Sequence, residues 1–148
     1  MPIRPENRDR YPAEWKEISD RVREEAGQRC EWCAAENGAL IARGKGADTG
    51  TYMMHDGRTF STETGDFLGL SWLLEYDVDR FTKIVLTVAH LDHQPENCTR
   101  DNLVALCQRC HNRYDAPMRR RGIAERQRAE MADGDLFSSI PSDTEGET

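Results

Sequence analysis

The sequence predicts a small α+β domain with a four-cysteine zinc site, an N-terminal helix, an inserted β-rich region and a disordered acidic tail. Two Cys-x-x-Cys pairs, Cys30–Cys33 and Cys107–Cys110, predict the zinc site. An amphipathic repeat predicts the helix, and β-branched stretches between the pairs predict strands. Because charged residues make up 32% of the 148-residue chain, the apolar core is expected to be small and to need the free energy of metal binding.

The spacing of the cysteines favours metal binding over disulfides. Each pair can present two thiolates from one tight turn, and two such turns complete a tetrahedral zinc site. The 73 residues between the pairs are tolerable because the entropy of loop closure grows slowly with length. No signal-peptide pattern and no membrane-spanning apolar run are found, so a cytoplasmic protein without membrane contact is expected. Cys98 is either an extra ligand or, as we expect, a spare and partly exposed thiol.

The N-terminal part predicts an arm followed by a helix. Residues 1–12 are rich in Pro, Arg and Asn and are expected to form an extended arm, and residues 13–130 to form one domain. Pro12 fits the first turn of a helix that ends near Ala26, with Gly27 as its C-terminal cap. The apolar stripe of this helix consists of Trp15, Ile18 and Val22.

An inserted region, about residues 38–83, is expected to be β-rich, but its function cannot be read from the sequence. An Asp-Gly hairpin signal lies between two strand-like flanks in residues 51–60. Residues 67–76 fit either a strand or a short helix. Residues 82–88 are rich in β-branched side chains and predict one strand that leads to His90.

The C-terminal part predicts two helices and a tail. A helix is expected to begin near Cys110 and to break around Pro117, because proline removes a backbone donor. A basic helix is expected over residues 118–130. Residues 131–148 carry five acidic residues and no basic one, and are expected to be disordered. Their Leu136-Phe137 pair loosely resembles peptides that dock on bacterial sliding clamps, although a purely solubilising tail is the simpler interpretation.

The charge of the chain permits DNA as a partner without arguing strongly for it. The net charge is −7, which is unfavourable for nucleic-acid binding because phosphate contacts supply much of the affinity. However, residues 84–130 contain eight arginines against six acidic residues. The half that contains the second cysteine pair is therefore mildly basic.

Three of the four histidines, His90, His93 and His111, lie within 22 residues, with Asn102 between them. One imidazole with a near-neutral pKa can take a proton from water, another can bind a divalent cation, and an asparagine amide can orient the first. Such parts suit metal-assisted hydrolysis of a phosphodiester. The fourth histidine, His55, is expected to be an exposed residue of the hairpin turn.

These motifs resemble the HNH endonucleases, specifically the zinc-stapled subgroup of bacteria and phages. The match covers Cys30–Cys33 and about residues 84–114. The resemblance implies a ββα-metal, treble-clef-like finger, in which a β-hairpin precedes a helix that carries the last metal ligand. It further implies that His90 is the general base, that Asn102 holds the His90 ring, and that His111 binds a catalytic cation such as Mg²⁺, Mn²⁺ or another transition metal. The four cysteines would hold structural Zn²⁺.

One departure from the family bears on activity. Many relatives carry an Asp or His immediately before the base, whereas Ala89 occupies that position and cannot bind metal. Asp92 or His93 would have to complete the catalytic site, although Asp92 also fits a loop-capping role and His93 a supporting one. Arginines on and after the metal helix either bind DNA phosphates or form a solvated face: Arg109, Arg113, Arg119, Arg120 and Arg121.

The leading prediction is a metal-dependent HNH endonuclease that hydrolyses DNA. A catalytically weak or inactive zinc-stapled nucleic-acid-binding module is an alternative that Ala89 and the acidic balance favour. A third possibility is an accessory nuclease subunit of a phage packaging or defence complex. Sequence specificity, the choice between nicks and double-strand breaks, and the oligomeric state are not encoded in these motifs.

Overall fold

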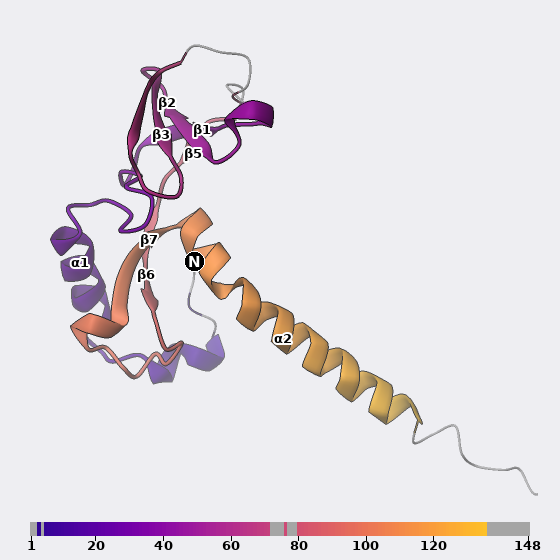
Figure 1. Ribbon diagram of the computed structural model, residues 1–148. Helices are drawn as coiled ribbons and strands as arrows, with labels where there is room; N and C mark the ends of the chain where they lie inside the picture. Colours follow the sequence, from indigo (N-terminus) through magenta and orange to yellow (C-terminus); the bar gives the residue numbers. More distant parts are fainter. Residues whose placement is uncertain (1–2, 4, 72–75, 77–79, 136–148) are drawn as a thin grey trace, which may run out of the picture. The chain divides into compact units, whose positions relative to one another are not determined.

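The computed structural model describes residues 3, 5–71, 76 and 80–135 of the chain (Figure 1). It confirms an α+β fold with antiparallel sheets and a C-terminal helix. The chain divides into two units, Met1–Arg113 and Tyr114–Thr148. This division falls inside the range 13–130 expected to form one domain, because the residues from Tyr114 onward contact mainly one another. Each unit is described by itself.

Helix α1 (Trp15–Glu25) has the amphipathic character expected from the sequence. Its Val22 is buried in an apolar cluster with Val88, Leu103 and Ala105. Trp15 and Ile18 are partly buried against the same cluster, so the apolar stripe is confirmed. The helix is followed by Gly27 at φ +64°, a left-handed conformation that costs glycine little and commonly terminates helices.

The N-terminal arm differs from the extended segment that was expected. Pro5–Arg10 form a 3-10 helix, η1. The arm is attached to the first unit at Arg10, whose Nε lies 2.5 Å from a carboxylate oxygen of Glu96. The next residue, Tyr11, packs its ring against Trp15 at a centroid distance of 5.1 Å. These contacts fold the arm back onto the domain, which composition alone could not indicate.

The inserted region is β-rich, as expected, and forms a five-stranded antiparallel sheet in the order β4-β3-β2-β1-β5 (Figure 1). The Asp-Gly hairpin is confirmed, with Gly57 at φ +87° between two paired strands. The ambiguous segment 67–76 begins as a strand, and Tyr76 is buried with Ala42 and Met53. The five strands are β1 (Leu40–Arg43), β2 (Thr51–Met54), β3 (Arg58–Ser61), β4 (Phe67–Leu70) and β5 (Thr82–Lys83).

The single strand expected over residues 82–88 is divided between two sheets. Its first part is β5, and its second part belongs to β6 (Leu86–His90). Between them, Ile84 is 1% exposed and its backbone exchanges hydrogen bonds with Gly38 and Ala39. The chain therefore stays extended while it passes from one sheet to the other, and β-branched composition cannot distinguish this from one strand.

The second sheet is a two-stranded ribbon of β6 and β7 (Leu103–Cys107). The strands are antiparallel, and their register pairs His90 with Leu103 at one end and Leu86 with Cys107 at the other. Helix α1 packs on the face that carries Val88. Strand β7 leads directly into helix α2 (Gln108–Asp135), so the order along the chain is strand, strand, helix.

Helix α2 is continuous from Gln108 to Asp135 and includes Pro117, so the break expected at this proline is wrong. Proline removes one backbone hydrogen bond, to the carbonyl of Arg113, but strong helix formers on both sides continue the helix. Residues 131–135 therefore belong to the helix rather than to a disordered tail. Leu136 and Phe137 lie outside the described residues. Within the described ranges, no helix combines the length and the apolar composition needed to cross a bilayer.

Candidate functional site

Four cysteines from two distant segments of the first unit lie close together. Each is 3% exposed or less, and their sulfur atoms all lie within 4.8 Å of one another. The Sγ atoms of Cys33 and Cys107 are 3.7 Å apart. Zn–S bonds of about 2.3 Å in a tetrahedron place sulfurs about 3.8 Å apart, whereas a disulfide requires about 2.05 Å. Free thiols thus form a site that can hold a metal ion such as zinc: Cys30, Cys33, Cys107 and Cys110.

The first cysteine pair is held against β7 by Glu31, which lies between the two cysteines. The Glu31 backbone N–H donates to the carbonyl of Ala105 at 3.0 Å. The Ala105 N–H in turn donates to a Glu31 carboxylate oxygen at 2.6 Å. This reciprocal pair of hydrogen bonds, which we call the Glu31 clasp, brings Cys30 and Cys33 next to Cys107. The Cys-x-x-Cys spacing alone does not predict the Glu31 clasp.

The inserted sheet supports the same turn from another side. The Tyr52 hydroxyl donates to the Cys33 carbonyl at 3.1 Å. Burial raises the pKa of Tyr52 to about 12, so the hydroxyl keeps its proton and remains a donor at neutral pH. Gly65 lies so close that a Cβ there would be 2.6 Å from the Cβ of Ala34. The insertion is therefore packed directly against the metal centre.

Hydrogen bonds within the cluster favour loss of a proton from Cys107. The thiols of Cys110, Cys30 and Cys33 all lie close to its sulfur and hold the pKa of Cys107 well below its usual range. A thiolate at one position is the form that binds a metal cation. The donor set and its burial both fit a closed, structural metal site.

His90 is buried at the end of β6 and is 7% exposed. Its ring stacks on Trp15 at a centroid distance of 4.8 Å and meets the edge of Tyr11 at 5.7 Å. Its Nε2 lies 3.6 Å from the Cys98 sulfur. Burial lowers the pKa of His90 in spite of the nearby charges of Asp92 and Glu96. The imidazole is therefore neutral at physiological pH.

His111 lies on the other face of the ribbon. Its Nδ1 is 2.6 Å from the hydroxyl oxygen of Thr87. Successive strand residues point to opposite faces, so Thr87 and Ala89 share one face of β6 and Val88 and His90 share the other. The structure therefore does not bring His90 and His111 together, although both were expected to serve one site.

Asn102 is buried, but its amide holds the loop after β6 and not the His90 ring. Its Oδ1 accepts a hydrogen bond from the Asp92 N–H, and its Nδ2 donates to Asp92 at 2.9 Å and to the Asn97 carbonyl at 2.8 Å. The Asn97 side chain also donates to Asp92 at 2.7 Å. The hydrogen bonds that Asp92 accepts from the Asn97 side chain, the Gln94 N–H and the Asn102 side chain lower its pKa to about 2. Asp92 thus caps the loop, one of the two roles considered for it.

A second metal centre is not assembled by the residues expected to form it. Among the described residues, only the four cysteines place three or more His, Cys, Asp or Glu ligand atoms within 4.8 Å of one another. Asp92, His93 and His111 do not form such a group. His93 has φ +56° and its backbone N–H donates to the His90 carbonyl. The three residues expected to bind a catalytic cation are therefore not gathered into one site among the described residues.

The remaining expected residues fall into three groups. His55 is exposed in the hairpin turn, and Cys98 is a partly exposed thiol outside the cluster, both as expected. Arg113 forms an exposed ion pair with Glu63 at 2.7 Å, while Arg109 lines a cavity. Three exposed arginines lie in the second unit: Arg119, Arg120 and Arg121.

Comparison of the chain with protein-family models, with curated proteins and with solved structures finds no match.

Proposed function

We propose that this chain is a metal-dependent endonuclease of the HNH type, which hydrolyses DNA phosphodiester bonds from a zinc-stapled ββα finger. The observation that carries the proposal is the order β6–β7–α2, with the second cysteine pair at the junction of β7 and α2 and His111 directly after it. The buried cysteine cluster fixes this junction to the first cysteine pair. The four cysteines hold Zn²⁺ and take no part in the chemistry.

The hydrogen bonds of Thr87 support a metal-binding role for His111. The Thr87 hydroxyl donates to the Leu106 carbonyl at 3.4 Å, so its oxygen is placed to accept a hydrogen bond from the Nδ1–H group of His111. In that tautomer Nε2 carries the lone pair that a divalent cation accepts. A cation bound there supplies charge stabilisation for the leaving oxygen.

His90 is the general base in this proposal. Its lowered pKa keeps the imidazole neutral, which is the form that can accept a proton from water. Tyr11 and Trp15 cover the ring. In this proposal, access of substrate water to His90 requires displacement of the arm that carries Tyr11, which Arg10 ties to Glu96 and Gln94.

Plasmid cleavage by the purified, zinc-loaded chain tests the proposal. We expect nicking or cutting with Mg²⁺ or Mn²⁺ and none with EDTA, with His111→Ala and His90→Ala each lowering the rate by about 10²-fold or more. His55→Ala, at the exposed turn, is the matched control and should keep full activity. Metal-dependent cleavage that survives both His90→Ala and His111→Ala would contradict the assigned roles.

A second function is favoured by one specific observation, the location of His90 and His111 on opposite faces of the ribbon, with Ala89, which cannot bind metal, immediately before His90. A zinc-stapled nucleic-acid-binding module without catalysis needs no shared site for these histidines. The same experiment separates the two functions, since the binding module would shift DNA in a gel or in fluorescence anisotropy and cleave none of it with any of the cations.

A further inference from the structure

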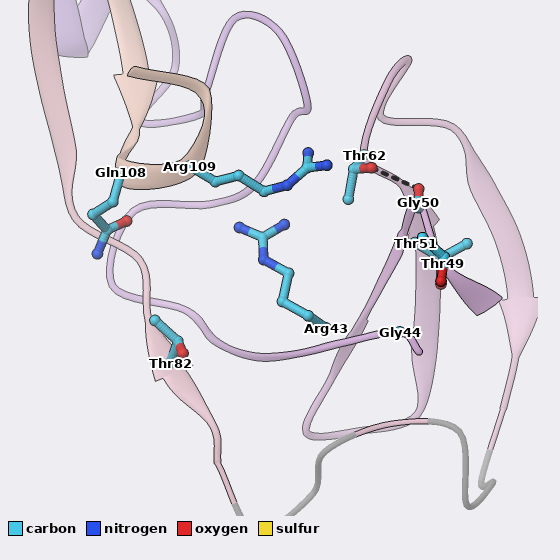
Figure 2. Close-up of a pocket in the computed structure, with 9 residues that line it drawn as sticks. All are labelled: Arg43, Gly44, Thr49, Gly50, Thr51, Thr62, Thr82, Gln108 and Arg109. Atoms are coloured by element: carbon cyan, nitrogen blue, oxygen red, sulfur yellow. Dashed lines mark hydrogen bonds between the residues drawn. The ribbon is translucent and has the colours of Figure 1, made fainter. Parts of the chain in front are cut away.

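The first unit contains a cavity of about 340 Å³ between the inserted sheet and the start of α2 (Figure 2). Arg43 enters it from the end of β1, and Arg109 enters it from the first turn of α2. Figure 2 shows both side chains extended, with the Arg43 guanidinium directed toward the Arg109 side chain and the Arg109 guanidinium directed toward Thr62. The rest of the lining consists of uncharged residues: Gly44, Thr49, Gly50, Thr51, Thr62, Thr82 and Gln108.

Both arginines have unsatisfied donors. The Nη1 atom of Arg43 and the Nη1 atom of Arg109 are buried, and neither has a hydrogen-bond partner among the described residues. A buried cationic donor without a partner is unfavourable because it has lost water and gained nothing in return. Two such groups directed into one cavity lined by no acidic residue add mutual repulsion. The missing partner is therefore an acceptor with negative charge.

Most of the other polar side chains of the cavity are already engaged. The Thr62 hydroxyl donates to the Gly50 carbonyl at 2.6 Å, and the Thr49 hydroxyl donates to the Gly46 carbonyl at 2.8 Å. The Gln108 side chain bonds the backbone on either side of Ile84, donating to the Lys83 carbonyl and accepting from the Val85 N–H. The guanidinium groups of Arg43 and Arg109 are thus the charged donors available to a ligand.

The position of Arg43 is fixed before a ligand arrives. Its guanidinium carbon lies 5.9 Å from the centre of the Tyr52 ring, a distance at which a cation is attracted to the ring face. The Tyr52 hydroxyl is in turn bonded to the Cys33 carbonyl. The cavity is therefore built on the same scaffold as the metal centre, and little side-chain ordering is required on binding.

We propose that this cavity binds a phosphate group, held between Arg43 and Arg109. The planar fork of a guanidinium matches two phosphate oxygens at once, and two arginines on opposite sides can satisfy both buried Nη1 atoms. The volume lies near the lower end of the roughly 300–1,000 Å³ typical of small-molecule sites, so the phosphate can carry a further group. The phosphate belongs either to a nucleic-acid backbone or to a free small molecule. The proposal does not depend on nuclease activity.

Thermal unfolding of the full, zinc-loaded chain measures the interaction with inorganic phosphate. Titration at constant ionic strength should raise the Tm of the wild type, because a ligand that binds only the folded state stabilises it. Arg43→Gln and Arg109→Gln should each weaken the phosphate response at least about tenfold, as expected for loss of a charged hydrogen bond. Arg58→Gln, an exposed arginine paired with Asp56, is the matched control and should respond like the wild type.

Arg109 lies between two metal-binding cysteines, so zinc content is measured for every variant and Arg43→Gln is the deciding one. Without phosphate, Arg43→Gln should be at least as stable as the wild type, since a buried unpaired charge is removed. With saturating phosphate the order should reverse. An equal phosphate response in the wild type, Arg43→Gln and Arg58→Gln would overturn the proposal, as would the absence of a response in the wild type.

Binding of a duplex oligonucleotide, followed by fluorescence anisotropy over a range of salt concentrations, identifies the source of the phosphate. If Arg43→Gln weakens DNA binding and flattens its salt dependence, the cavity takes a backbone phosphate. If Arg43→Gln loses only the response to inorganic phosphate, the cavity takes a small phosphorylated molecule. If neither measurement changes, the cavity is not a phosphate site.

Discussion

At the scale of single residues, side chains that follow one another along β6 contact different parts of the protein, because successive strand residues point to opposite faces of the sheet. His90 points toward Trp15 of α1 and Tyr11 of the N-terminal arm, and Thr87 points to His111. Ala89 lies on the Thr87 face, the face on which His111 lies, and its methyl group offers no ligand atom there.

Burial of His90 predicts a pH-dependent stability. Its pKa is lowered in the folded state, so the unfolded chain binds more protons below the ordinary histidine pKa of about 6.5. The stabilisation is complete above that pKa and is lost as the pH falls toward the folded value. We expect urea-unfolding free energies of the wild type to decrease between about pH 7.5 and pH 5 more steeply than those of His90→Phe, which keeps an aromatic ring against Trp15.

The cysteine cluster also binds protons as the pH falls, and it contributes equally to both proteins, so the difference between them isolates His90. His55→Gln, which changes an exposed histidine, should follow the wild-type curve. Identical pH dependence in the wild type and His90→Phe would show that His90 titrates normally and is not enclosed.

At the scale of secondary-structure elements, the Glu31 clasp joins the first cysteine pair to β7. Glu31→Ala would leave the Ala105 N–H without its acceptor at a residue that is 0% exposed. Leaving a buried donor unsatisfied costs about 1–3 kcal/mol. We expect this loss in urea unfolding, together with weaker zinc binding in competition with a chelator. Glu31→Gln, which keeps a side-chain oxygen as acceptor, should recover most of both.

Glu36→Ala is the control for charge. Glu36 forms an exposed pair with Arg29 at 3.4 Å, and such pairs contribute about 0–1 kcal/mol. A loss in Glu31→Ala no larger than in Glu36→Ala would mean that the clasp does not hold the cysteine pair in place.

Local sequence patterns predicted the secondary-structure elements well, but they predicted the contacts between these elements poorly. The stripe of α1 and the Asp-Gly turn depend on periodicity and on one backbone conformation, so both could be read directly. The division of residues 82–88 between two sheets depends on bonds of Ile84 to Gly38 and Ala39, which no local pattern encodes. The helix break predicted at Pro117 was wrong for the opposite reason, since the helix formers around this proline outweigh the one backbone hydrogen bond that it removes.

The candidate sites differ in the same way. The cysteine cluster was predictable because each pair shows the Cys-x-x-Cys spacing within four residues of sequence, and two such pairs are typical of a metal site. The role of Arg43 could not be predicted, because Arg43 and Arg109 line one cavity only when the fold brings β1 next to the start of α2. The enclosure of His90 could not be predicted either, because the contact between Tyr11 and His90 depends on how the N-terminal arm folds back onto the domain.

At the scale of the whole molecule, the four-cysteine cluster joins segments that are far apart in the sequence. Cys30 and Cys33 follow α1, while Cys107 and Cys110 join β7 to α2, and the inserted sheet packs on the first pair through Tyr52. A metal ion at this point therefore links α1, the insertion and the ribbon. Since such a site rarely exists in an unfolded chain, the free energy of metal binding becomes free energy of folding.

Zinc removal should therefore unfold the first unit cooperatively. We expect elemental analysis to give one zinc per chain, and a strong chelator to abolish the near-ultraviolet circular dichroism of the packed aromatic residues, with recovery on adding zinc back. Cys33→Ser and Cys107→Ser should each lose the metal and the folded signal. Cys98→Ser should keep both, because its sulfur lies outside the cluster. A metal-free chain with an unchanged aromatic signal would show that the packing of the two sheets and α1 is sufficient for folding.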